Sequence, residues 1–443
     1  MFDTDNIKKT YFSMALPVVI GMVITLIYNL ADTWFISQTN NTALIAGVSI
    51  CSPLFTALMA FGNIFGQGGS SLISRLLGGN DPKSVRRVSS FCFYIAIAVG
   101  VVLAVILFFT RNVVLGLFGA DETNIKFASQ YFVTLSLGSP IIVLNFIHSN
   151  LVRCEGMAKE SMFGSLIGTV VNIILDPIFI FTLNMGALGA ALATVIGYLV
   201  TDVFFIILVM KKSKNLSMEI KACHVKGDEL GQILGVGITA AITNLMSSLC
   251  MIIMNRFLGD YGNDALAAMG MVLKVSMVAQ LILVGFSFGG VPIYGFLYGA
   301  KDTKKLKELS SFCIKFLGAL ALFFSVLLIV FAGPIMGRFS QDPKVYDYCV
   351  KMLRYQSLGV VFVSLVLYVS VYFQATGKVV RAFIMSISRQ GVVFIVVIFI
   401  MSKLFGFNGV LLSQAVSDLL SAILGGLLFV TASGKAPKGD KEG

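Results

Sequence analysis

Four aspartates stand inside long apolar stretches of this chain, where charged side chains are rare: Asp32, Asp176, Asp202 and Asp418. If those stretches cross a lipid bilayer, an ionised carboxylate near its centre costs about 2.5 to 3.5 kcal/mol even on a lenient insertion scale. A carboxylate retained at that cost indicates a function. Two carboxylates beside other oxygen atoms can hold a proton or a hard cation such as Na+.

Five polar residues of the first half fall at a similar predicted depth. Counted at about 1.5 Å per residue from the predicted helix ends, all of them lie in the outer half of the membrane. Asn172 and Asp176 share a helix face, because side chains at i and i+4 stack. We therefore predict one cation-coupling site, for H+ or Na+, formed by Asp32, Tyr131, Asn172, Asp176 and Thr194. The candidate Na+ ligands are Asp32, Asn172, Asp176 and Thr194.

Two prolines bear on the helices that carry these acids. Asp176 precedes Pro177, so a second interpretation is that it only marks a helix break while Asp32 reaches the membrane interface. Pro17 lies in the inner half of the same span as Asp32 and removes a backbone hydrogen bond, which predicts a helix kink. Such a kink could couple protonation to bending, or Pro17 could be a tolerated membrane proline.

The remaining charged or titratable residues inside predicted spans are expected to have partners, because buried charges need them. Lys274, Arg389 and Asp418 lie far from either membrane face, and we predict that they form one network in the second half. Its role, structural or in substrate coupling, is open. His148 is expected to be a packed polar residue rather than a proton relay, and Asp202 to be interfacial rather than to extend a proton path from Thr194.

The elements that position these residues are membrane-spanning helices. Hydrophobic residues make up 57% of the chain, charged residues only 12%, and the mean hydropathy is +0.90. Soluble domains carry roughly 25% charged residues, so the chain is a polytopic all-α integral membrane protein. Stretches of about 20 apolar residues or more predict twelve transmembrane helices, at 10–37, 46–78, 86–110, 123–152, 161–183, 186–210, 230–258, 263–299, 304–333, 343–373, 379–403 and 406–431.

The net charge of +11 follows membrane topology rather than a nucleic-acid site. With the N-terminus inside, far more Lys and Arg residues fall in the inner segments than in the outer ones, as the positive-inside rule requires. Both termini are therefore predicted to be cytoplasmic, in the cell membrane, and no nucleic-acid partner is expected. The C-terminal part of this charge is Lys435, Lys438 and Lys441.

The chain is a diverged tandem duplication. The tetrapeptide SSFC occurs at 89–92 and again at 310–313, an offset of 221 positions, and Gly68, Gly78 and Asp81 return at the same offset. Two repeats with an even number of spans are parallel, related by an axis along the membrane normal, which is a transporter architecture. We predict an N-lobe at 1–215, a cytoplasmic linker at 216–229 and a C-lobe at 230–443.

The second repeat lacks the acids of the first. At offset 221, Asp32 corresponds to Ile253, Asn172 to Val393 and Asp176 to Val397, and at offset 220 Thr194 corresponds to Gln414. The second copy is thus expected to keep the scaffold without the cation chemistry.

Several other classes are excluded by the residues present. The seven cysteines form no CxxC pair and fall mostly inside spans, so neither a disulfide framework nor a metal site is indicated. The glycine-rich segment 66–84 lacks the Gly-Lys-Ser/Thr ending of a phosphate loop. No nucleophile motif and no sizeable soluble domain occur, so an enzyme is not expected, and neither is a cofactor beyond the coupling ion.

The pattern resembles the MATE (multidrug and toxic compound extrusion) family, most closely its bacterial MepA-like and DinF-like members. The resemblance is carried by PVVIGMVITLIYNLADTWFI at 17–36, GTVVNIILDPIFIF at 168–181, and the second-span and eighth-span motifs GNIFGQGGSSLISRLLGG and GFSFGGVPIYGFLYGAKD. It implies two six-helix lobes in a V, with the positions of Asp32, Tyr131, Asn172, Asp176 and Thr194 coupling transport to a cation and Pro17 bending the first helix. The seventh-span and tenth-span acids of NorM-like members are missing here.

The predicted function is a cation-coupled multidrug efflux antiporter that works by alternating access. It would export lipophilic organic compounds, mostly cationic, in exchange for H+ or Na+, and would act as a monomer in the bilayer. The alternative is a flippase for lipid-linked precursors of the related MOP type. Twelve spans and an acidic first lobe argue against that alternative.

Overall fold

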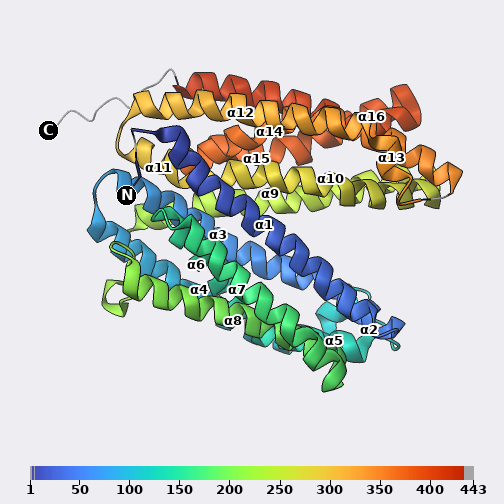
Figure 1. The fold of residues 1–443 in the computed structure, drawn as a ribbon, viewed down its shortest axis with the longest axis horizontal. Coiled ribbons are helices and arrows are strands. Elements are labelled where there is room, and N and C mark those ends of the chain that lie inside the picture. Colours follow the sequence, from blue (N-terminus) through green and yellow to red (C-terminus); the bar gives the residue numbers. More distant parts are fainter. Residues whose placement is uncertain (1, 4, 341, 434–443) are drawn as a thin grey trace. The chain divides into compact units, whose positions relative to one another are not determined.

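The computed structural model describes residues 2–3, 5–340 and 342–433. The predicted cytoplasmic C-terminus with Lys435, Lys438 and Lys441 therefore lies outside the described residues. Helices make up both compact units of the chain, and no strand occurs among the described residues (Figure 1). The first unit is Met1–Ala241 with Gly289–Thr303, and the second is Ile242–Phe288 with Lys304–Gly443.

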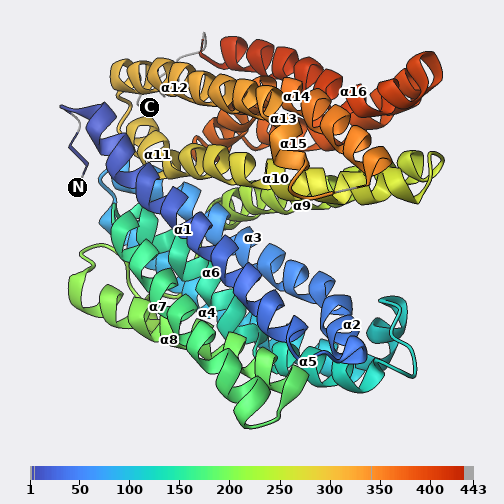
Figure 2. The same cartoon turned by 45° about the vertical axis from the view of Figure 1, so that its right-hand side comes forward.

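The first unit consists of helices that run roughly alongside one another (Figure 2). Their bounds are α1 (Ile7–Ser37), α2 (Thr42–Ile50), α3 (Ser52–Gly78), α4 (Pro82–Leu117), α5 (Ile125–Leu137), α6 (Ser139–Cys154), α7 (Ala158–Pro177), the π-helical η1 (Ile178–Thr182), α8 (Gly186–Lys212), the short η2 (Ile220–Ala222) and α11 (Val291–Gly299). The first part of α9 (Gly227–Gly259) also belongs to it.

The second unit contains the rest of α9 and the later helices. These are α10 (Asn263–Gly289), α12 (Thr303–Val330), α13 (Ala332–Met336), α14 (Pro343–Ala375), α15 (Val379–Ile387), the π-helical η3 (Ser388–Val392) and α16 (Val393–Ser433). Its core gathers buried apolar residues of α9, α10, α14 and α16, among them Leu258, Met352 and Phe394. The predicted lobes differ from these units in that residues 230–241 and 289–303 pack with the first unit; the lobe boundaries remain a prediction from the repeat.

The helices have the length and composition of membrane spans. Ten of those described pass on length and hydropathy, or eleven if α5 and α6, bent by 54° at Gly138, form one broken span. The last of them, Val379–Ala432, is 54 residues long, which at about 1.5 Å per residue is far more than one crossing of a ~30 Å core needs. It divides at Gly406, so the twelve predicted spans are accounted for.

Gly406 divides that helix because its backbone is left-handed. Its φ is +53°, and Gly186, its equivalent at offset 220, has φ +55° at the start of α8. A residue without Cβ adopts this region without steric cost. Other positions share positive φ across the repeat at offset 221, namely Asn80 (+55°) with Lys301 (+57°), and Gly156 (+86°) with Gly377 (+69°). The duplication seen in the sequence is thus repeated in the backbone.

α1 is one helix from Ile7 to Ser37, and Pro17 lies inside it with its side chain buried. No residue of α1 departs from helical geometry in the part of the chain that is described. The kink predicted at Pro17 therefore remains a prediction.

Candidate functional site

Small residues bring α7 and α8 into close contact in the first unit. A Cβ placed on Gly168 would lie 2.7 Å from the carbonyl oxygen of Gly197, and one on Gly197 would lie 2.8 Å from the carbonyl oxygen of Gly168. Membrane helices lack a hydrophobic driving force for association and pack through such small residues. The crossing sets the distance between Asn172, which follows Gly168 on α7, and Thr194, which precedes Gly197 on α8.

Beyond this crossing lies a buried polar cluster. Asn172 and Asp176 of α7 are 2% and 0% exposed, and Thr194 of α8 is 3% exposed. The Cβ of Asn172 lies 3.2 Å from the position that a Cβ on Gly197 would occupy, so this face of α7 meets α8. Tyr131 of α5 is also buried, at 9% exposure, and lies within electrostatic range of Asp176.

Asp32 joins this cluster from α1, which packs along α7 (Figures 1 and 2). Its side chain is partly exposed, whereas its Oδ1 is buried without a hydrogen-bond partner. The Asp32 carboxylate is close enough to interact electrostatically with the Asp176 carboxylate and with the Tyr131 hydroxyl. The structure therefore brings together the five residues that the sequence analysis placed in one site.

The cluster holds polar atoms that the protein itself does not satisfy. Oδ1 of Asp32, both carboxylate oxygens of Asp176 and both amide atoms of Asn172 are buried and form no hydrogen bond with any described residue. In folded proteins the large majority of buried side-chain polar atoms have a hydrogen-bond partner. Oxygen atoms left free in this way fit a bound proton or a hard cation such as Na+.

The donor set does not suit a transition metal. No group of three or more His, Cys, Asp or Glu side chains that could hold a metal ion occurs among the described residues. Carboxylate, amide and hydroxyl oxygens are instead the ligands of hard cations, which is the chemistry that the sequence predicted.

Two tyrosines belong to the cluster and were missed by the sequence analysis. The hydroxyls of Tyr28 and Thr194 are 3.2 Å apart, which joins α1 to α8. Tyr198 lies one turn after Thr194 and within electrostatic range of Asp32. The i, i+4 spacing of Tyr28 from Asp32 and of Tyr198 from Thr194 was the signal that could have found them.

Asp202 lies sixteen residues after the start of α8 and is buried against neighbouring helices, and its expected interfacial role remains a prediction. It is 2% exposed, and Asn145 donates its Nδ2 hydrogen to Asp202 Oδ1 over 3.2 Å. His148 Nδ1 lies 3.8 Å from the same oxygen, and the His148 ring packs between Phe93 and Phe205. The burial follows from the packing of α6 against α8, which covers this face of α8.

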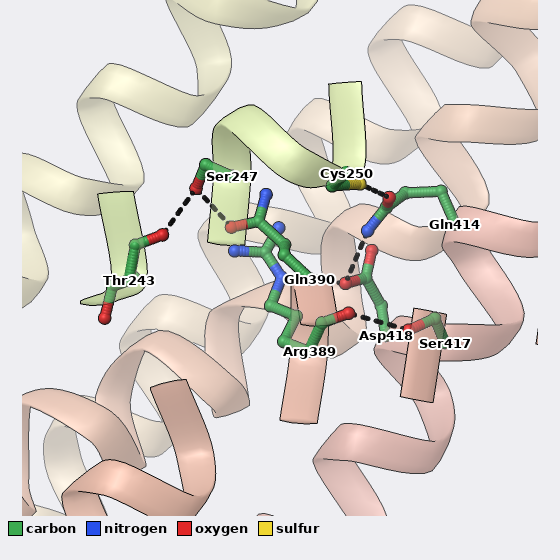
Figure 3. A network of polar contacts seen from close by, with 8 residues as sticks. All are labelled: Thr243, Ser247, Cys250, Arg389, Gln390, Gln414, Ser417 and Asp418. Carbon is green, nitrogen blue, oxygen red and sulfur yellow. Dashed lines mark hydrogen bonds and ion pairs between the residues drawn. The ribbon is translucent and has the colours of Figure 1, made fainter. Parts of the chain in front are cut away.

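The second unit has a different polar network, drawn in Figure 3. Arg389 Nε donates to Asp418 Oδ1 at 2.8 Å, and Gln414 Nε2 donates to the same oxygen at 3.2 Å. Cys250 donates its thiol hydrogen to Gln414 Oε1 at 3.2 Å. Lys274 does not join them, because its side chain is exposed and forms no ion pair or hydrogen bond with any described residue; the single network of three charges is corrected to a pair.

The two networks occupy equivalent places in the repeat. At offset 220, Thr194 corresponds to Gln414 and Tyr198 to Asp418. In each copy the first residue lies eight positions, and the second twelve positions, after the left-handed glycine, which is Gly186 or Gly406. The first copy surrounds this place with acids, whereas the second places Arg389 there.

Comparison with known proteins is consistent with this duplicated helical architecture. The MatE family model matches the chain twice, at residues 17–178 and 239–400. The chain belongs to the MatE family. It is accordingly a multi-pass membrane transporter and not an enzyme, as the sequence predicted.

The relatives of this MatE protein cover nearly its whole length. Multidrug export protein MepA of Staphylococcus haemolyticus (strain JCSC1435) is 32% identical over 424 residues, which is 96% of this chain and 93% of the relative. MepA of Staphylococcus aureus (strain MRSA252) is 30% identical, with 95% and 93% covered. A solved outward-facing conformation of a multidrug resistance MATE family transporter of the MOP superfamily matches with a TM-score of 0.90 and 25% identity, covering 97% of both chains.

Proposed function

We propose that this transporter is a cation-coupled multidrug efflux antiporter, which exchanges H+ or Na+ at the first-unit cluster for organic compounds. The observation that carries the proposal is the set of buried, unpartnered oxygens on Asp32, Asn172 and Asp176. Relatives that are 30% or more identical over nearly the whole chain are named multidrug export proteins, which supports the same activity here.

The chemistry of the cluster suits exchange. An ion that fills the free oxygens of α1 and α7 stabilises one packing of these helices, because it satisfies buried polar groups that are otherwise unpaired. Reciprocal linkage then requires that substrate, if it prefers the other arrangement, be released when the ion binds. Thr194 and Tyr28 connect α1 to α8 at the same place and transmit the change to the neighbouring helix.

The substrates proposed are small organic compounds, lipophilic and mostly cationic. The chain supplies 37 Phe, 13 Tyr and 19 Met residues for apolar walls, and methionine suits surfaces that accept varied ligands. We further propose that the protein works as a monomer in the cell membrane with both termini in the cytoplasm, on the basis of its Lys and Arg distribution.

The test is transport by proteoliposomes under an imposed proton gradient or an imposed Na+ gradient. Ethidium movement should follow one of the two gradients in the wild type and should be lost in Asp32→Asn and Asp176→Asn. Asp260→Asn is the matched control, because Asp260 is an exposed acid outside the cluster. Gradient-independent movement of a lipid-linked precursor, with no ethidium transport, would instead favour the flippase.

A further inference from the structure

Only part of the Arg389 guanidinium forms hydrogen bonds with described residues. Its Nε is bound to Asp418, and the structure gives neither terminal amino group a hydrogen bond to any described residue (Figure 3). The Arg389 side chain is 17% exposed, whereas that of Asp418 is 3% exposed. One edge of the guanidinium is therefore anchored in the protein, and the other edge is open.

The backbone that carries Arg389 is held in an unusual shape. η3 is a π-helical turn, and Gly391 within it has φ −108° and ψ −109°, outside the helical region. Ser417 Oγ donates to the Arg389 carbonyl at 2.8 Å, and a Cβ on Gly391 would meet Met246 Sδ at 2.7 Å. π-helical turns are rare and occur often at functional sites. Arg389 is the second residue of this turn.

The depth of Arg389 decides what its open edge faces. It lies ten residues after the start of α15, which at about 1.5 Å per residue places it near the middle of a ~30 Å hydrocarbon core. Charged side chains at that depth face protein or water rather than lipid tails. At this depth the terminal amino groups of Arg389, which no described residue bonds, need water or a polar ligand as a partner.

The surroundings of the open edge are polar. Ser247 of α9 donates to Gln390 Oε1 at 2.5 Å, and Thr243, one turn earlier, hydrogen-bonds Ser386 at 2.8 Å. Gln390 is the chain neighbour of Arg389, and Figure 3 shows its side chain joined to Ser247. The site also stands where the first repeat has its cation cluster, since Gln414 and Asp418 correspond to Thr194 and Tyr198.

We propose that Arg389 is the anchor of a ligand subsite in the second unit, and that this subsite binds the carboxylate of zwitterionic organic substrates. A guanidinium presents paired N–H donors in a plane that matches the two oxygens of a carboxylate. Asp418 is a positioning residue. It accepts the hydrogen bond from Arg389 Nε and leaves the two terminal amino groups of the Arg389 guanidinium for the ligand. The proposal rests on the proposed export function, and it extends the substrate class from cations to compounds that carry both charges.

Two rhodamines test the subsite, because rhodamine 110 has a free carboxylate and rhodamine 123 is its methyl ester. Binding of each dye to purified protein is measured by fluorescence polarisation, and transport of each by proteoliposomes. The variants are Arg389→Lys, which keeps a cation beside Asp418 but loses the fork, and Arg389→Gln combined with Asp418→Asn, which leaves no buried unpaired charge. Lys351→Gln is the control, since Lys351 is an exposed cation of the same unit.

We expect the double variant to bind rhodamine 110 about tenfold more weakly, the loss that one charge-assisted hydrogen-bond pair accounts for. Rhodamine 123 should change by less than about twofold, Arg389→Lys should fall between, and Lys351→Gln should leave both dyes unchanged. Equal loss for the two dyes would show that the Arg389–Asp418 pair is only structural, and no loss for either would also overturn the subsite. If neither dye is transported by the wild type, the export function fails, while the binding ratio still decides the subsite.

Discussion

Gly78 and Gly299 stand at equivalent positions of the two sequence repeats, and each packs against the backbone of the helix that carries the other. A Cβ on Gly78 of α3 would lie 1.9 Å from the Phe296 carbonyl oxygen of α11, and one on Gly299 would lie 2.0 Å from the Arg75 carbonyl oxygen of α3. The contact is reciprocal, as a local two-fold relation between the repeats requires. Both helices lie in the first compact unit.

This contact predicts that Gly78→Ala and Gly299→Ala are each destabilising, by about 1 to 3 kcal/mol, because a methyl group cannot fit against a backbone carbonyl without moving a helix. Thermal unfolding of the detergent-purified protein measures the change. Gly116→Ala is the matched control, since nothing lies within 4 Å of its Cβ position. Unchanged stability in both repeat variants would mean that α3 and α11 do not pack this closely.

Asn172→Leu should separate stability from transport. Both amide atoms of Asn172 are buried and unpartnered, and an unsatisfied buried polar group costs about 1 to 3 kcal/mol. Replacing it with an apolar residue of similar size should raise the unfolding temperature while abolishing gradient-driven ethidium transport. Loss of stability together with transport would show that Asn172 has a structural partner and is not an ion ligand.

The Asp81 side chain caps the start of α4, and we expect its contribution to the stability of the protein to depend on pH. Hydrogen bonds from Ser84, by its side chain and its backbone amide, hold the pKa of Asp81 below its ordinary value. Because the folded-state pKa is the lower one, this stabilisation is present above the unfolded pKa near 4 and is lost as the pH falls through the folded value. Asp81→Ala should therefore cost about 1 kcal/mol at pH 7 and progressively less in acid.

Asp81→Asn is the control for that titration, since an asparagine caps a helix without ionising. Its stability difference from the alanine variant should stay constant across the same pH range. A difference for Asp81→Ala that also stayed constant in acid would contradict the role of the ionised carboxylate.

The Glu155 carboxylate attaches the segment after α8 to the first unit. Its Oε1 accepts hydrogen bonds from the backbone amides of Lys214 and Asn215 at 2.9 and 2.8 Å, and its Oε2 accepts one from Ser213 Oγ. Glu155→Ala should accelerate hydrogen–deuterium exchange at these two amides at least tenfold. Glu219→Ala, which changes an exposed acid of the same segment, should not.

Much of the architecture could be predicted from the sequence because it depends on local properties. Hydropathy marks the spans, and the offset of 221 positions marks the duplication, which the left-handed residues at 80, 156 and 186 and their equivalents repeat in the backbone. The five residues of the first-unit cluster were also found, since a polar side chain in an apolar span is conspicuous and depth follows from counting residues. The last two predicted spans, 379–403 and 406–431, form one nearly continuous helical stretch in the structure, which departs from helical geometry at Gly406.

Partners across helices were decided by the tertiary structure alone. A membrane helix is apolar on most of its faces, so its sequence does not state which face meets a neighbour. For that reason Tyr28 and Tyr198 were missed, and the contact of Asp202 with Asn145 was not foreseen. Lys274 was grouped with Arg389 and Asp418, although its exposed side chain joins neither of them. Helix rotation and close crossings such as that of Gly168 with Gly197 set these contacts, and they arise only when the helices pack together.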